Sequence, residues 1–413
     1  MPADTVLDEA NTTLQELKHW LLQQGGYFHP HVQFKKVASG FSVVASENLP
    51  PDTSVVSCPF TLAITKNVAL YALSVLLGSA ASSLLVTWSE RQLISSYLCF
   101  HWIVGDDTSS TNVLAHLPYV RSLPSQEKLM TPLHFSPLEV EQIKGSNLYG
   151  ATLDRQREWR TEWAQCQACI ASVNVEWGNQ FTWDLFLSAA THLSSRAFPS
   201  TLLLKTLTLT SPSVPEPILL PGVDCLNHSR AEPVSWVQSY VGDGPIGGAG
   251  STLSLTLHNP AVAGAEIFNN YGLKPNSELI LGYGFSLPDN PDDTIVLKIG
   301  GIEGKKWEVG RNAHGADEVW ETVLEFVGGS EPTYEDYLEA AEVLADMVQV
   351  LLERLPKLPV NGGQDIRQEV ALMLHDYVKG QTEILTSLIE YASSKEELGI
   401  AMAKASGIDV VLQ

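Results

Sequence analysis

Side chains that can hydrogen-bond a ligand or move a proton gather in two short stretches. Asp224, Asn227 and His228 form a polar turn at the end of an apolar segment, where buried polar groups need partners. Further along, residues 266–272 pass from a short apolar pair, expected to be a strand, into two asparagines and Tyr271. An amide, an imidazole and a phenol held in place can match a ligand's donors and acceptors, and an imidazole can act as a general base.

The elements that must hold these turns mix helical and strand patterns. Residues 11–24 have the spacing of an amphipathic helix, and residues 37–64 contain short β-branched runs broken by prolines. Residues 183–195 predict a core-facing helix that ends at Arg196, and residues 251–257 alternate as a half-buried strand. The sequence therefore predicts an α+β fold.

Residues 68–88 carry no charged side chain and approach the length of a membrane span. Their serines make the stretch less apolar than a typical span, and the flanking Lys66 and Arg91 set no clear orientation. We therefore expect one buried helix here and no membrane partner.

The spacing of apolar residues changes beyond about residue 305, where residues 334–355 and 366–391 have the pattern of long amphipathic helices. This region holds 9 basic and 20 acidic residues, so 9 − 20 = −11 of the total charge of −22 lies here. Two interpretations remain open: ordinary solvated helix faces, or a surface that attracts a basic protein.

Composition excludes several classes of partner and site. A net charge of −22 argues against nucleic acid, which needs Lys and Arg at its phosphates. The five scattered cysteines, without a recognisable signal peptide, indicate reduced thiols in the cytoplasm or nucleus. Cys166 and Cys169 have the spacing of half a zinc site, but a second pair is missing, so no metal is expected.

At the two polar stretches the sequence resembles the SET-domain protein methyltransferases, specifically the branch of the plant Rubisco large-subunit lysine methyltransferase and its fungal relatives. The family signature is an Asn-His pair preceded by Asp and followed later by a Tyr-Gly step. It is matched by Asp224, Asn227, His228, Tyr271 and Gly272. The resemblance extends through residues 131–145, 181–186 and 195–198 and covers most of the chain.

The resemblance implies a mostly β SET domain with pseudoknot-like C-terminal threading, split by a helical insert and followed by an all-α domain. The implied ranges are residues 1–304 for the SET domain, with its N-terminal part at about 25–65, the insert at about 66–180 and its C-terminal part at about 181–290, and residues 305–413 for a helical substrate-binding domain.

The resemblance also implies a monomeric enzyme that transfers methyl groups from S-adenosylmethionine (AdoMet) to a lysine of a protein, by analogy a ribosomal protein or translation factor. Tyr271 is the expected catalytic residue. The expected cofactor-binding residues are Ser39, Gly40, Phe41, Arg196, Asn227, His228 and Tyr271. The expected lysine channel is lined by Phe198, Asp224 and Tyr283.

Two alternatives are retained. A relative of this fold methylates histidine and has a polar residue at the position of Phe198, which offers no such group, so lysine is favoured. The other is an inactive scaffold, because Ser42 replaces the second glycine of the family's Gly-x-Gly turn.

Overall fold

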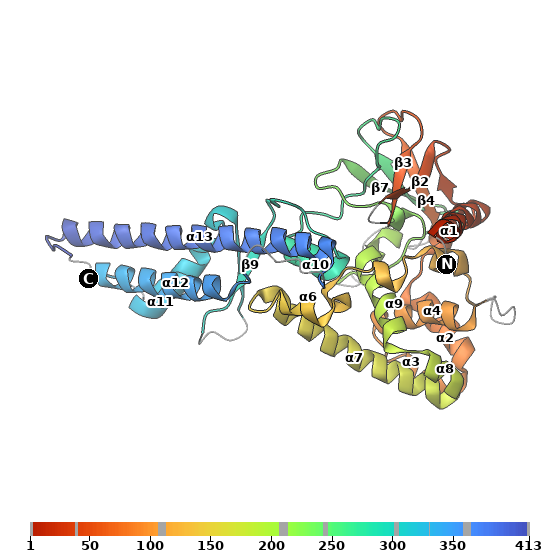
Figure 1. Ribbon diagram of the computed structural model, residues 1–413, viewed down its shortest axis with the longest axis horizontal. Helices are drawn as coiled ribbons and strands as arrows, with labels where there is room; N and C mark the ends of the chain where they lie inside the picture. The colour runs from red at the N-terminus through yellow and green to blue at the C-terminus, as the bar shows by residue number, and fades with distance from the viewer. Residues whose placement is uncertain are drawn as a thin grey trace. The chain divides into compact units, whose positions relative to one another are not determined.

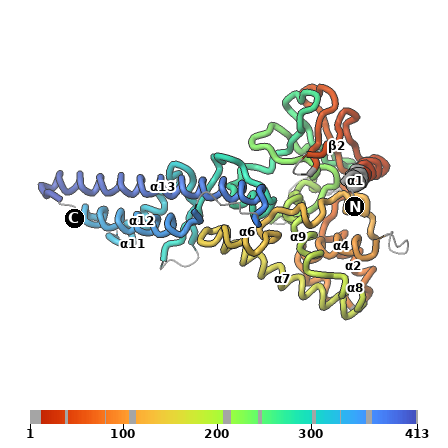
Figure 2. Tube along the Cα trace, in the orientation of Figure 1, coloured from red at the N-terminus to blue at the C-terminus, as the bar shows by residue number. Residues whose placement is uncertain are grey.

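The computed structural model describes residues 3–37, 40–105, 113–205, 214–242, 247–300, 305–329, 331–357 and 365–410 (Figures 1 and 2). The chain forms two compact units, each built from two segments. The first unit is Met1–Leu129 with Arg157–Leu273, and the second is Met130–Gln156 with Lys274–Gln413.

Short antiparallel strands form the β part of the first unit. Its largest sheet has the order β1 (Tyr27–Phe28), β4 (Ser54–Pro59), β8 (Thr252–Leu257), β7 (Val234–Ser239). Two smaller sheets pair β2 (Val32–Val37) with β3 (Gly40–Ala45) and β5 (Phe198–Pro199) with β6 (Pro217–Ile218). Alternate residues of β8 are buried, as its sequence predicts.

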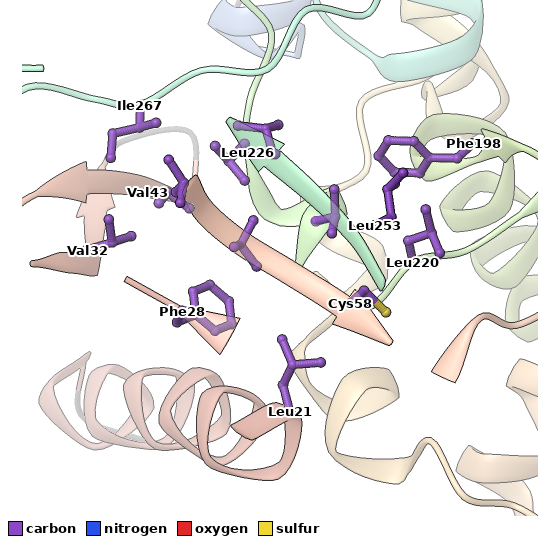
Figure 3. Packing of buried hydrophobic residues seen from close by; sticks show 14 of the residues in the cluster. Leu21, Phe28, Val32, Val43, Cys58, Phe198, Leu220, Leu226, Leu253 and Ile267 are labelled. Atoms are coloured by element: carbon purple, nitrogen blue, oxygen red, sulfur yellow. The ribbon is translucent and has the colours of Figure 1, made fainter. Parts of the chain in front are cut away.

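One hydrophobic core joins these sheets to the N-terminal helix α1 (Ala3–Gln23) (Figure 3). Leu21 of α1 packs in the same cluster as Val43 of β3, Leu253 of β8 and Phe198 of β5. Strands of two to six residues bury little surface individually, so this shared core holds them together.

Helices make up the rest of the first unit. They are α2 (Lys66–Leu77), α3 (Ser79–Leu85), α4 (Glu90–Val104), α5 (Leu117–Ser122), most of α7 (Asn147–Val173), α8 (Val175–Gln180) and α9 (Trp183–Arg196). The predicted helix at residues 183–195 is α9, which begins after the capping Thr182 and ends at Arg196. The 3-10 turns of this unit are η1 (Phe60–Leu62), η2 (Gln126–Lys128), η4 (Ser200–Leu203) and η5 (Val223–Cys225), whereas η3 (Pro132–His134) and η6 (Arg311–Ala313) belong to the second unit.

The expectation of one buried helix at residues 68–88 is wrong. The stretch forms α2 and α3, which are separated at Gly78, where a φ of 73° is incompatible with a continuing helix. Both helices also have an exposed side, on which Tyr71 and Leu84 lie. Among the described residues, no helix is long and apolar enough to cross a membrane.

The second unit combines helices with one β-hairpin. Its elements are α6 (Pro137–Glu141), the beginning of α7, α10 (Asn276–Tyr283), β9 (Thr294–Leu297), β10 (Trp307–Gly310), α11 (Ala316–Gly328), α12 (Tyr334–Arg354) and α13 (Gln368–Ala405). The helix predicted at residues 334–355 is α12, whereas α13 continues well beyond residue 391. Because β9 pairs with β10, residues on both sides of the expected boundary at 304 belong to one compact unit.

Asn276 is a fully buried polar side chain of this unit. Its Nδ2 donates to the Leu287 carbonyl oxygen (2.9 Å), and its Oδ1 accepts from the Leu287 backbone N–H (2.8 Å). Its backbone N–H donates to Oδ1 of the buried Asp293 (2.8 Å). The side chain thereby closes the turn that follows α10.

We predict that Asn276→Ala lowers the free energy of unfolding by about 3 kcal/mol, because two partly buried backbone groups of Leu287 and the buried Asp293 carboxylate would lose a partner. Urea unfolding followed by tryptophan fluorescence measures the loss. The control Gln349→Ala removes an exposed amide that reaches only Glu353, and should change stability by less than about 0.5 kcal/mol. A loss no larger than that of the control would refute the role given to Asn276.

Candidate functional site

The turn η5 and the residues that follow it place some side chains in the protein interior and others at the surface. It begins after Gly222, whose φ of 87° favours glycine and whose missing Cβ would lie 2.8 Å from the Leu21 side chain. Asp224 is consequently turned into the protein, while Asn227 is exposed and His228 half-buried. A close approach of the backbone to the core thus sets which residues face solvent.

Asp224 forms a buried ion pair with Arg196. The Arg196 Nη1 donates to the Asp224 carbonyl oxygen (2.9 Å) and lies 3.7 Å from the Asp224 Oδ2. Tyr119 of α5 completes the group by donating its hydroxyl to the same Oδ2 (2.6 Å). The Asp224 side chain is 0% exposed and that of Arg196 22% exposed, so only the guanidinium reaches the surface.

Burial dominates the electrostatics of this group. It raises the pKa of Asp224, although the charge of Arg196 and the Tyr119 hydrogen bond act in the opposite direction. Burial also raises the pKa of Tyr119, which therefore stays protonated and can donate. For Arg196, burial opposes the charge, but the neighbouring Asp224 raises its pKa overall.

Tyr271 is held against His228. The Tyr271 backbone N–H donates to His228 Nδ1 (3.0 Å), and the two rings stack with centroids 5.0 Å apart. The Tyr271 hydroxyl donates to the Leu226 carbonyl oxygen (2.8 Å). Because Nδ1 accepts a hydrogen bond, a neutral His228 carries its proton on Nε2.

The backbone around Tyr271 is irregular, and the short strand expected at residues 267–268 is not formed. Isolated bridges flank it instead, between Glu266 and Val44 of β3 and between Asn269 and His228. The Asn227 Nδ2 also donates to Glu266 Oε1 (2.8 Å). Single pairings with two different segments, rather than a ladder, fix this part of the chain.

Phe198 and Trp236 form an aromatic pair beside these turns. Their rings meet edge to face with centroids 5.0 Å apart, and Phe198 is buried. The Trp236 Nε1 donates to Asn269 Oδ1 (3.0 Å), which ties this pair to the segment that leads to Tyr271. The pair provides an apolar surface with fixed ring positions.

The remaining expected residues are placed as follows. Ser39 lies outside the described residues, while Gly40 and Phe41 open strand β3. Ser42 is buried within β3, opposite Lys35 in regular antiparallel pairing. Tyr283 ends α10 and belongs to the second unit, where the Lys274 ammonium lies 5.9 Å from its ring and burial raises its pKa.

Sequence reasoning missed three residues of this site: Tyr119, Trp236 and Glu266. Tyr119 lies 105 positions before its partner Asp224, in a helix whose local pattern gives no sign of a site. Glu266 was within the stretch of interest, but only the structure reveals its bond to Asn227.

The chemistry of these donors fits a nucleoside that carries an amino-acid carboxylate. Among the described residues, the side-chain hydrogen bonds of Arg196 come from Nη1 alone, which leaves a partly exposed fork of donors for a carboxylate. The exposed amide of Asn227 and the half-buried imidazole of His228 offer the mixed donors and acceptors that a purine ring needs.

Comparison with known proteins supports this interpretation. No protein-family model matches the chain. It is 30% identical to ribosomal lysine N-methyltransferase set10 of Schizosaccharomyces pombe over 292 residues, which cover 69% of this chain and 48% of set10. It is 24% identical to protein-lysine N-methyltransferase EFM1 of Saccharomyces cerevisiae, over 92% of this chain and 73% of EFM1. The chain thus spans about half the length of set10 and more of EFM1.

Solved structures decide the fold. The SET domain of LSMT bound to lysine and AdoHcy matches with a TM-score of 0.73 and 17% identity, over 95% of this chain and 93% of that one. The chain has the SET-domain fold of Rubisco LSMT. Rubisco LSMT bound to AdoMet gives a TM-score of 0.72 at 17% identity, over 94% of this chain and 93% of that one. The resemblance inferred from the motifs, the α+β class and the helical C-terminal region of this SET-domain protein are confirmed.

We predict that His228→Leu destabilises the first unit by about 1 kcal/mol more than His228→Asn, because the Asn side-chain oxygen can still accept from the Tyr271 N–H. Urea unfolding of the two variants measures this difference. Equal stability of both would show that the bond at Nδ1 contributes nothing to the fold.

Proposed function

We propose that the chain is an AdoMet-dependent protein-lysine N-methyltransferase. The observation that carries the proposal is the placement of Tyr271: its hydroxyl is bound at the Leu226 carbonyl, next to the buried Arg196–Asp224 pair. The names of set10 and EFM1 and the fold shared with Rubisco LSMT support the same activity.

The residues that would hold AdoMet come from three segments of the first unit. Arg196 offers its remaining donors to the carboxylate of the cofactor, and Asn227 with His228 offers partners for adenine. Gly40 and Phe41 at the start of β3, together with Ser39, which precedes them in the sequence, would contact the methionine end. When bound, AdoMet would supply an electrophilic methyl group that a neutral amine can accept, with AdoHcy as the thioether leaving group.

The chain's own contribution is alignment and exclusion of water. The Tyr271 hydroxyl, fixed by the Leu226 carbonyl, would orient the lysine amine toward the methyl group. Phe198 and Trp236 would form an apolar wall of the lysine channel, in which desolvation lowers the pKa of the amine and favours its neutral, reactive form. The expected place of Asp224 in the channel lining does not fit its fully buried side chain, which would instead support Arg196 from behind. The expected role of Tyr283, in the second unit, stays a prediction.

Two observations bear on the retained alternatives. Phe198 contacts Trp236 and offers no polar group to an imidazole, which favours lysine over histidine as the methyl acceptor. Ser42 lies in regular extended backbone, where a side chain is tolerated, so its replacement of glycine imposes no strain that would indicate an inactive scaffold.

The substrate we propose is a basic protein, either a ribosomal protein or a translation factor. We further propose that the enzyme is a monomer and acts in the cytoplasm or nucleus. The name of set10, a ribosomal lysine methyltransferase, supports the substrate class. The acidic helices beyond residue 305 would attract such a substrate and serve as its binding domain, because opposite charge steers association.

We predict that Tyr271→Phe lowers the methylation rate by about 100-fold or more, because the hydroxyl that orients the amine is lost. Labelled AdoMet and extract of an S. pombe strain lacking set10 provide the assay, followed by mass spectrometry of the labelled protein. AdoMet affinity, measured by calorimetry, should change less than about twofold, since the ring still stacks on His228.

Three results would count against these assignments. Wild-type protein without AdoMet binding would refute the activity. Label on histidine would select the other acceptor. Undiminished activity of Tyr271→Phe would refute the role of its hydroxyl.

We predict that reversing Glu339, Glu342 and Asp346 to Lys raises the KM for the protein substrate by about tenfold at low salt, because attraction becomes repulsion. All three side chains are exposed on α12. The corresponding triple Gln variant should have an intermediate KM, and added salt should reduce all the differences. An unchanged KM in a folded Lys variant would favour the interpretation as a solvated surface.

A further inference from the structure

Tyr119 connects the inserted helices to the proposed site. It is buried on α5, and its hydroxyl reaches across 105 residues of sequence to Asp224 Oδ2 (2.6 Å). A buried tyrosine usually finds some partner for its hydroxyl, often a backbone carbonyl. Here the partner is a fully buried carboxylate that also faces Arg196.

The Asp224 carboxylate is stabilised by Arg196, by the Tyr119 hydroxyl and by the backbone N–H groups of Gly222 and Asp224. Cys225 is next to it with Sγ 4.0 Å from Oδ1, and the buried Cys58 thiol is close enough to interact electrostatically. A buried ion pair is stable only when its remaining lone pairs also find donors. The Tyr119 hydroxyl is therefore the one neutral donor that supports the carboxylate oxygen nearest to Arg196 among the described side chains.

The position of Arg196 depends on this arrangement. Its Nη1 is hydrogen-bonded to the Asp224 carbonyl at 2.9 Å but stays 3.7 Å from Oδ2. Because Oδ2 already accepts from Tyr119, the carboxylate is held at this distance and the guanidinium keeps its other nitrogens for a ligand. Without the hydroxyl, the carboxylate would keep the backbone N–H groups of Gly222 and Asp224, but Oδ2 would shift toward Arg196 and pair with those nitrogens.

We propose that Tyr119 is a positioning residue, which acts through Asp224 to hold Arg196 ready for the carboxylate of the cofactor. The inference rests on the proposed function. It assigns to the inserted helices a direct part in cofactor affinity, in addition to their part in the fold.

Tyr119→Phe tests the proposal, with Tyr97→Phe as the matched control. Tyr97 of α4 is as deeply buried as Tyr119, and its hydroxyl is bonded to His116 Nδ1 (2.6 Å) rather than to Asp224. Both variants lose one buried hydroxyl and should lose comparable stability, which urea unfolding measures. Only Tyr119→Phe changes the surroundings of Asp224.

Two ligands separate positioning from general damage. AdoHcy carries the amino-acid carboxylate, whereas 5′-methylthioadenosine lacks it. Calorimetry should show that Tyr119→Phe lowers the affinity for AdoHcy by about tenfold and the affinity for 5′-methylthioadenosine by less than about twofold. Tyr97→Phe should leave both affinities within about twofold of wild type.

Other outcomes are equally decisive. Wild-type affinity of Tyr119→Phe for AdoHcy would overturn the inference and leave the hydroxyl a purely structural role. Equal weakening of both ligands would also overturn it, because the loss would not involve the carboxylate. If wild-type protein bound neither ligand, the proposed function itself would fail.

Discussion

The Arg196–Asp224 pair is the interaction on which the site depends. Removing a carboxylate from water is costly, and the cost is tolerable only with several partners in good geometry. These partners come from the end of α9, the turn η5 and α5, so three separate elements must be in place together. The core residues that pack against Gly222 determine how closely the backbone of η5 approaches the core. The position of the Asp224 charge therefore depends on this packing.

Tyr271 is held by a different principle. Its contacts at both ends involve the main chain: its own N–H at His228 and its hydroxyl at the Leu226 carbonyl. The Leu226 carbonyl is kept under side-chain substitution, whereas the bond at His228 needs its imidazole. The orientation of Tyr271 therefore depends on the path of the two turns and on His228. Single bridges and the Trp236–Asn269 bond fix that path where a regular ladder is missing.

Local sequence patterns predicted the regular helices and strands and the motif residues. They could not predict contacts between residues that lie far apart in the sequence. The apolar stripe at residues 183–195 and the alternation at 251–257 predicted α9 and β8, because each has one buried face. The uncharged run at residues 68–88 led to a wrong prediction of one helix, because Gly78, with its positive φ, divides the run into two helices. Tyr119 could not be found from sequence, because its role arises only when α5 meets η5.

The interleaving of the two units constrains how the chain can acquire its structure. Glu139, about a third of the way along the sequence, is buried and paired with Arg367, which lies 228 residues later. During synthesis on the ribosome, residues 130–156 therefore emerge long before the helices that cover them. The first unit likewise waits for residues 157–273 before Asp224 can meet Tyr119. The first unit can close once residue 273 has emerged, but residues 130–156 must wait for α13. We therefore expect nascent chains to need protection of the apolar surface of residues 130–156 until the last helix is released.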